Sequence, residues 1–243
     1  MRLFLKRFHK NLYIFAAFFF FSLCFPFIYF LAKNATKNYQ KIVQLRKWFS
    51  LTSVHLVGIR FKVSYETPID WSRPYILCPN HSSILDITAL NYVCPQPFTF
   101  MGKEELLKNP ITRIFFKSVD IPVNRDSKIS SFKAYKRASQ LLQEGRSVVI
   151  FPEGKIDHLY PPILQKFKPG AFRMAIDNNI PILPIVIHNA WEIMWDDGQK
   201  FGSKPGTIHI SVLSPIKADS VQNLHHHAVE TEVFEKMNQI WKR

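Results

Sequence analysis

The sequence predicts an α/β fold, a mixed sheet flanked by helices, which follows an apolar N-terminal helical segment. Short apolar or alternating runs recur along the chain with helical patterns between them, as in α/β proteins. Pro, Asn and Gly end many of these runs. One charge-free run near the N-terminus is far longer than a strand. We therefore expect a membrane-associated helical segment over residues 1–56 and an α/β domain over residues 57–243.

The N-terminal segment contains no charged residue from position 12 to position 32. That length is enough to cross a bilayer, which takes ~20 apolar residues. Pro26 interrupts the run, and basic residues flank it on both sides, so the positive-inside rule selects no orientation. We favour a bent segment embedded in one leaflet, then a basic interfacial helix from about residue 38 to 56, with both ends on the cytoplasmic side. A full crossing is the alternative.

The remaining elements follow from periodicity and turn residues. Residues 57–65 alternate apolar and polar side chains, which indicates a half-buried strand. Further strands are expected at residues 75–77, 98–101, 119–125, 147–151, 182–187 and 207–212. Helices are expected after residue 82 and at residues 110–118, 130–143, 171–178 and 229–242.

Composition limits the classes of partner and the compartment. The chain has 243 residues and a formal net charge of +14, so an anionic partner is expected: nucleic acid, anionic lipid or a phosphorylated substrate. Its three cysteines are odd in number and form no Cys-x-x-Cys pair, which fits a reducing compartment.

The stretch after the strand at 75–77 holds the strongest candidate for catalysis. His81 lies between this strand and the next helix, where open α/β sheets place their sites. If His81 precedes the helix, its ring can fold back onto the first turn and meet Asp86. The carboxylate would fix the tautomer and leave the other ring nitrogen as a base. On this pair alone, a capped helix with a surface histidine remains an alternative.

Other potential nucleophiles and ligands lie close by or near the C-terminus. Cys78, at the end of a buried strand, is more typical of a small apolar side chain than of a nucleophile. Ser82 or Ser83 can cap the following helix, and the sequence has no Gly-x-Ser-x-Gly elbow. The histidines at 225–227 cannot converge on one ion within a regular element, so we expect an exposed loop and no metal site.

Four short blocks occur in order along the chain. They are Asn80-His81 with Asp86, residues 119–125 (VDIPVNR), residues 151–154 (FPEG) and residues 182–185 (ILPI). Residues 103–106 (KEEL) and 167–172 (FKPGAF) lie between them. Together these blocks resemble the glycerolipid acyltransferases typified by the bacterial 1-acylglycerol-3-phosphate acyltransferases, over roughly residues 55–215.

The resemblance implies an acyltransferase domain at residues 57–243. Its expected reaction moves a fatty acyl group from acyl-CoA or acyl carrier protein to the sn-2 hydroxyl of 1-acylglycerol-3-phosphate, giving phosphatidic acid without a covalent intermediate, a metal or a cofactor. His81 would be the general base and Asp86 its partner. The expected substrate-binding residues are Asn80, Lys103, Arg125, Glu153, Gly154, Lys155 and Lys168. The resemblance further implies contact with membrane lipids and an active site on the cytoplasmic face, as in a bacterial inner membrane.

The third block departs from the family pattern, which usually continues with Thr and then Arg or another polar residue. Here the chain continues Lys155-Ile156-Asp157. Lys155 can supply a cation, but another lysophospholipid or a lyso-aminolipid stays open as acceptor. The charge also fits a membrane-tethered nucleic-acid-binding protein, although no zinc finger, helix-turn-helix or RNP-like block is present, and we expect no nucleic-acid partner. A Ser or Cys hydrolase would instead form a covalent acyl-enzyme.

Overall fold

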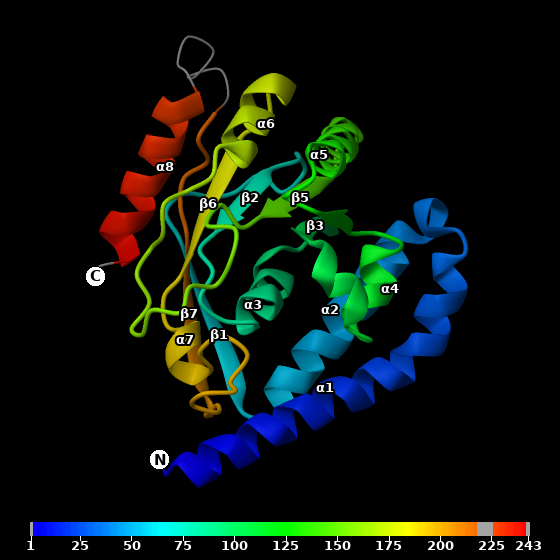
Figure 1. Ribbon diagram of the computed structural model, residues 1–243, viewed down its shortest axis with the longest axis vertical. Coiled ribbons are helices and arrows are strands. Elements are labelled where there is room, and N and C mark those ends of the chain that lie inside the picture. Colours follow the sequence, from blue (N-terminus) through cyan, green and yellow to red (C-terminus); the bar gives the residue numbers. More distant parts are fainter. Residues whose placement is uncertain (1, 218–225, 242–243) are drawn as a thin grey trace.

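The structure, a computed structural model, describes residues 2–217 and 226–241. Its elements in chain order are α1 (Leu3–Ala32), α2 (Ala35–Leu56), β1 (Ile59–Tyr65), β2 (Ile76–Pro79), α3 (Leu85–Val93), β3 (Phe98–Lys103), η1 (Glu104–Lys108), α4 (Thr112–Phe116), β4 (Ile121–Val123), α5 (Lys128–Gln143), β5 (Ser147–Ile150), α6 (Gly170–Asn178), β6 (Ile182–Ile187), α7 (Ala190–Ile193), β7 (Gly206–Val212) and α8 (His226–Trp241). The predicted α/β fold with a mixed sheet is confirmed (Figure 1).

A seven-stranded sheet, in the order β1-β7-β6-β2-β5-β3-β4, forms the centre of the molecule. The neighbours from β6 to β4 are parallel, β7 runs antiparallel to β6, and β1 runs parallel to β7. His81, Arg125 and Glu153 come just after the C-terminal ends of β2, β4 and β5. Because parallel strands end at one edge of a sheet, three of the four sequence blocks meet there.

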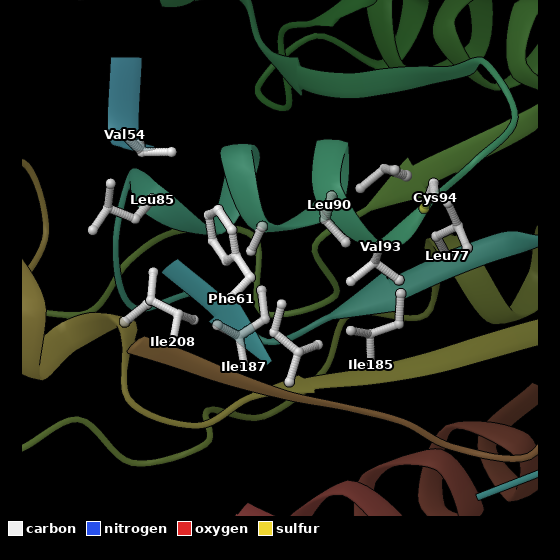
Figure 2. Close-up of a cluster of buried hydrophobic side chains, with 14 of the residues drawn as sticks. Val54, Phe61, Leu77, Leu85, Leu90, Val93, Cys94, Ile185, Ile187 and Ile208 are labelled. Carbon is white, nitrogen blue, oxygen red and sulfur yellow. The ribbon is translucent and has the colours of Figure 1, made fainter. Parts of the chain in front are cut away.

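Two buried apolar clusters cover the two faces of the sheet. In one cluster, α3, α7 and part of α2 pack against one face of the sheet. In the other cluster, α5, α6 and α8 pack against the opposite face. Figure 2 shows Leu90 and Val93 of α3 above Ile185 of β6, in the same cluster as Leu85 of α3 and Leu77 of β2. Burying such side chains stabilises the fold by about 1.5–3 kcal/mol each. This packing fixes the helix that carries Asp86 relative to the strand end that carries His81.

The N-terminal segment forms an antiparallel pair of helices (Figure 1). Pro26 lies within α1, and the helix continues past it to Ala32. The second helix begins at Ala35, earlier than expected, because the Asn34 side chain caps it by accepting the Lys37 N–H at 3.3 Å. Large apolar side chains along α1 are exposed, among them Phe4, Phe8, Phe15, Phe18 and Phe30.

Helix α2 is tied to the α/β residues by a buried ion pair. Arg46 donates to both carboxylate oxygens of Asp120, at 2.8 and 3.0 Å, and to the Phe98 carbonyl at 2.8 Å. Both side chains are almost fully buried. Of the basic residues in the predicted interfacial helix, Arg46 therefore faces the protein and not the membrane surface.

Several helices differ in detail from the sequence prediction. Helix α3 begins at Leu85, and its N-cap residue Ile84 supplies no side-chain cap, while the Ser82 and Ser83 N–H groups bind Asp86. The Ser83 hydroxyl accepts only the Leu85 N–H, at 3.1 Å. The short helices η1 and α7 are absent from the sequence prediction. The loop expected at residues 225–227 is wrong where it is described, since α8 begins at His226, and His225 lies outside the described residues.

Candidate active site

The turn between β2 and α3 brings His81 and Asp86 together, and we call residues 81–86 the catalytic turn. The His81 Nδ1 lies 3.0 Å from Oδ2 of Asp86. The same oxygen accepts the N–H groups of Ser82 at 2.7 Å and Ser83 at 2.8 Å. Asp86 is fully buried, so three donors hold one carboxylate oxygen in a fixed place. A carboxylate can only accept here, so Nδ1 carries the proton and Nε2 keeps its lone pair.

The imidazole of His81 is also held from one face. Its ring stacks on Phe151, with 4.0 Å between centroids and 25° between planes. The His81 side chain retains 17% of its accessible surface, so the ring is not sealed inside the protein. A ring fixed at one nitrogen and one face, with some exposure left, suits a general base.

Glu153 connects the catalytic turn to the loop after β5. Its Oε1 accepts the His81 N–H at 2.7 Å, and its Oε2 accepts the Gln165 N–H at 2.9 Å. Burial raises the pKa of Glu153 to about 7, against the opposing effect of these two hydrogen bonds. Both oxygens are therefore engaged by the backbone, which makes Glu153 a positioning group for His81.

A cavity of about 610 Å³ opens beside the ends of β3, β4 and β5. Its lining includes the cations Lys103, Lys108, Arg125, Lys155 and Lys168 and the carboxylates Glu104, Glu105 and Asp126. Partial burial, and then the positive charges of Arg125, Lys103 and Lys155, lower the pKa of Lys168. Mutual repulsion among these groups is relieved when an anion binds between them. The cavity is therefore suited to a phosphate group.

Arg125 and Gly154 are in direct contact at the cavity wall. The Arg125 guanidinium donates to the Gly154 carbonyl. Gly154 has a φ of +81°, and a Cβ there would collide with the guanidinium. Glycine at this position thus allows the backbone of the third block to approach the arginine of the second block.

Asn80 is placed in the sheet instead of the cavity. Its amide donates to the Ile187 carbonyl at 3.1 Å and accepts the Ile187 N–H at 2.7 Å. The side chain is buried, and it joins the end of β2 to the end of β6. The structure therefore brings together Lys103, Arg125, Gly154, Lys155 and Lys168, and assigns a structural contact to Asn80.

The alternative nucleophiles are poorly placed. Cys78 is fully buried in the core on the other face of the sheet, and burial raises the pKa of its thiol. Ser82 and Ser83 are buried too. Among residues 2–217 and 226–241, no three His, Cys, Asp or Glu side chains gather in a way that could hold a metal ion.

Two features near the site were missed by sequence reasoning. Glu105 lines the cavity close to Arg125, although only Lys103 of the same motif was predicted as a site residue. Asp196 lies near His81 and pairs through its backbone with the catalytic turn. Burial and the neighbouring Asp197 raise the pKa of Asp196, while His158 and His81 act in the opposite direction. Asp196 lies outside all four blocks, so no motif could have identified it.

A His-Asp pair at the C-terminal edge of a sheet, next to a cationic cavity, is an arrangement suited to an enzyme that acts on an anionic substrate through a histidine base. Residues 60–188 match the family described as Acyltransferase, and the chain belongs to that family.

Similar proteins carry related names. The chain is 29% identical over 171 residues to human 1-acyl-sn-glycerol-3-phosphate acyltransferase beta, which covers 70% of this chain and 60% of that protein. It is 31% identical over 138 residues to the 1-acyl-sn-glycerol-3-phosphate acyltransferase of Borreliella burgdorferi, covering 56% of this chain and 54% of that one. The chain thus spans about three fifths or less of these two relatives.

The crystal structure of the 1-acyl-sn-glycerophosphate acyltransferase PlsC from Thermotoga maritima is similar over the whole chain. It has a TM-score of 0.81 and 19% sequence identity, and the match covers 100% of this chain and 97% of that one. At this identity the likeness establishes the fold, including its N-terminal helices.

Proposed function

We propose that this protein transfers a fatty acyl group from a thioester to the sn-2 hydroxyl of 1-acylglycerol-3-phosphate, giving phosphatidic acid. Membership of the Acyltransferase family and the names of the relatives support this reaction. The observation that carries it is the His81–Asp86 pair beside a cavity rich in cations.

The reaction needs a base and correct alignment. Nε2 of His81 takes the proton of the acceptor hydroxyl, and the oxygen attacks the thioester carbonyl. The new C–O ester bond forms as the C–S bond breaks, and the proton passes from His81 to the departing thiolate. Asp86 holds the imidazolium that forms in between. General base catalysis of this kind contributes about 10²–10⁴-fold. Acyl-CoA and acyl carrier protein are both suitable donors.

The cationic cavity would hold the acceptor phosphate. The Arg125 guanidinium offers a planar pair of donors to phosphate oxygens, and Lys103, Lys155 and Lys168 add charge. Glu153 links the two parts of the site, because it binds the His81 N–H and directly precedes Gly154 in the cavity wall.

A second acceptor is supported by the carboxylates in the same cavity. Glu104, Glu105 and Asp126 could accept the ammonium group of a lysophospholipid or lyso-aminolipid. The third block, with Lys155-Ile156 in place of the usual residues, is the sequence feature that favours this alternative.

We place the enzyme on a membrane, with α1 embedded in one leaflet and the active site on the cytoplasmic side, as in a bacterial inner membrane. In the described residues, α1 is long and apolar enough to cross a bilayer. Most of its apolar stretch is not buried within the protein. The apolar residues left exposed on α1 would contact acyl chains.

The test is an acyl-transfer assay with a panel of substrates. Purified protein is incubated with labelled acyl-CoA or acyl carrier protein thioester and with four acceptors: 1-acylglycerol-3-phosphate, lysophosphatidylcholine, lysophosphatidylethanolamine and a lyso-aminolipid. Phosphatidic acid as the dominant product supports the proposal. Transfer to a zwitterionic acceptor alone would replace it with the second candidate, and trapping of an acyl-enzyme would refute the direct mechanism.

A further inference from the structure

The loop from Trp195 to Ser203, which we call the bridging loop, contacts both the catalytic turn and the first turns of α1. In Figure 1 the chain after α7 runs down toward the N-terminal half of α1. The bridging loop contains none of the four sequence blocks.

One end of the bridging loop is hydrogen-bonded to the catalytic turn. The Asp196 N–H donates to the Ser82 carbonyl at 3.1 Å, and the Ile84 N–H donates to the Asp196 carbonyl at 3.0 Å. These bonds lie on either side of Ser83, which donates its own N–H to Asp86. The position of two of the three donors to the catalytic carboxylate therefore depends on where Asp196 lies.

The other end of the bridging loop is hydrogen-bonded to α1. The Ser203 N–H donates to the Lys6 carbonyl at 2.9 Å, and the Ser203 hydroxyl lies 2.7 Å from Nδ1 of His9. Nε2 of His9 lies 2.8 Å from the Val57 carbonyl, so this nitrogen carries the proton and Nδ1 accepts from the hydroxyl. Ser203 is only 1% exposed.

Gly202 allows the closest approach between the bridging loop and α1. It has a φ of +70°, and a Cβ at this position would collide with the backbone of Lys6. Backbone atoms of a helix cannot move aside as a side chain can. The absence of a side chain at Gly202 is thus required for α1 to lie where it does.

The bridging loop is braced between its two ends. The Gly198 N–H donates to the Trp195 carbonyl, and the Gly202 N–H donates to the Gly198 carbonyl, at 2.9 and 2.8 Å. The Trp195 and Phe201 rings are in contact, with centroids 5.6 Å apart. Trp195 is buried. A displacement at Gly202 would therefore be carried to Asp196.

We propose that Gly202, Ser203 and His9 are positioning residues for catalysis, through which the first turns of α1 hold the bridging loop and, through it, the catalytic turn. The N-terminal turns of α1 thus position the bridging loop in addition to contacting the membrane. The expected effect on kcat rests on the proposed acyl transfer, whereas the expected effect on the hydrogen exchange of the catalytic turn does not.

The test compares Gly202→Ala with Gly145→Ala. Gly145 has a φ of +81° with nothing within 4 Å of an added Cβ, so both variants strain the backbone alike and only Gly202→Ala displaces α1. We measure kcat and KM in detergent and the fraction of protein that sediments with phosphatidylcholine–phosphatidylglycerol vesicles. We also measure hydrogen exchange of the peptide spanning residues 82–86. A displacement of about 1 Å can cost on the order of 10²-fold in rate, so kcat of Gly202→Ala should fall ten- to a hundredfold.

For Gly202→Ala alone, we expect a lower kcat and faster hydrogen exchange in residues 82–86. Its KM and the fraction of protein that sediments with vesicles should stay unchanged. Equal kcat and equal exchange in the two variants would overturn the proposal. If the wild-type protein transfers no acyl group, the proposed function fails, and the exchange comparison decides the positioning role by itself. If Gly202→Ala does not fold, Ser203→Ala takes its place; faster exchange than in wild type is then expected, and unchanged exchange overturns the proposal.

Discussion

At the residue scale, the site depends on what each carboxylate binds. Asp86 holds the imidazole of His81 and two backbone N–H groups, and Glu153 holds the backbone of the same histidine. The sequence predicts the first contact, because the spacing lets a histidine before a helix fold back on its first turn. The second joins residues 72 positions apart and follows only from the parallel order of β2 and β5.

Glu153 should make stability depend on pH. Its pKa is about 7 in the folded protein, above the ordinary value of 4.5 for a glutamate, so the folded state binds the extra proton more tightly. The contribution to stability is therefore full below pH 4.5 and is lost as the pH rises to about 7, by at most about 1.4 kcal/mol per pH unit. Urea unfolding across this range should give a steeper decline for wild type than for Glu153→Gln; parallel curves would contradict the assignment.

Arg125 should act on the acceptor more than on the donor. A hydrogen bond to a charged group is worth about 1.5–3 kcal/mol, so Arg125→Ala should raise the acceptor KM by roughly 10- to 100-fold. The KM of the thioester should stay nearly constant. Arg137→Ala, on the exposed side of α5, is the matched control. An unchanged acceptor KM in the Arg125 variant would remove this residue from the phosphate site.

At the element scale, the N-terminal helices combine exposed and buried roles. Composition predicts their apolar character and length, yet it gives no sign that Arg46 faces inward. That arginine pairs with Asp120, at the start of the second sequence block, and its guanidinium lies over the Phe98 and Phe100 rings. Such a partner is invisible in the sequence because 74 positions separate the two residues.

Breaking this ion pair should be costly. Asp120→Ala leaves the Arg46 charge buried without its carboxylate, which typically destabilises a protein by about 3–5 kcal/mol. Glu232→Ala removes the exposed Glu232–Lys236 pair, and such pairs contribute only about 0.3–0.5 kcal/mol. Denaturant unfolding of both variants in detergent measures the difference. Similar losses in the two variants would mean that Asp120 does not hold α2 in place.

At the scale of the whole molecule, the order of strands and helices was predictable and their spatial arrangement was not. The sequence predicts seven strands, one of them by its clean alternation of apolar and polar residues, and each is found close to its expected place. The antiparallel pairing of β7 with β6, and the bridging loop beside α1, arise from contacts between distant segments. The cationic character of the cavity was predictable in part, since Lys103, Arg125 and Lys168 belong to the motifs.

Membrane contact should depend on the exposed face of α1. Phe4, Phe8 and Phe15 are 76%, 61% and 67% exposed, and burial of a Phe side chain is worth about 1.5–3 kcal/mol. Replacing all three with Ser should lower vesicle affinity by at least about 100-fold. Phe132→Ser, on the exposed face of α5, should leave it unchanged. Equal binding by both variants in a sedimentation assay would place the membrane contact elsewhere.

The most direct measurement is the rate of labelled acyl transfer to 1-acylglycerol-3-phosphate by wild type, by His81→Ala and by His209→Ala, the last an exposed histidine on β7. Removal of the base should lower kcat by about 10²–10⁴-fold in His81→Ala, with vesicle binding intact and His209→Ala fully active. A His81→Ala protein that folds, binds vesicles and transfers acyl groups at the wild-type rate would contradict the account.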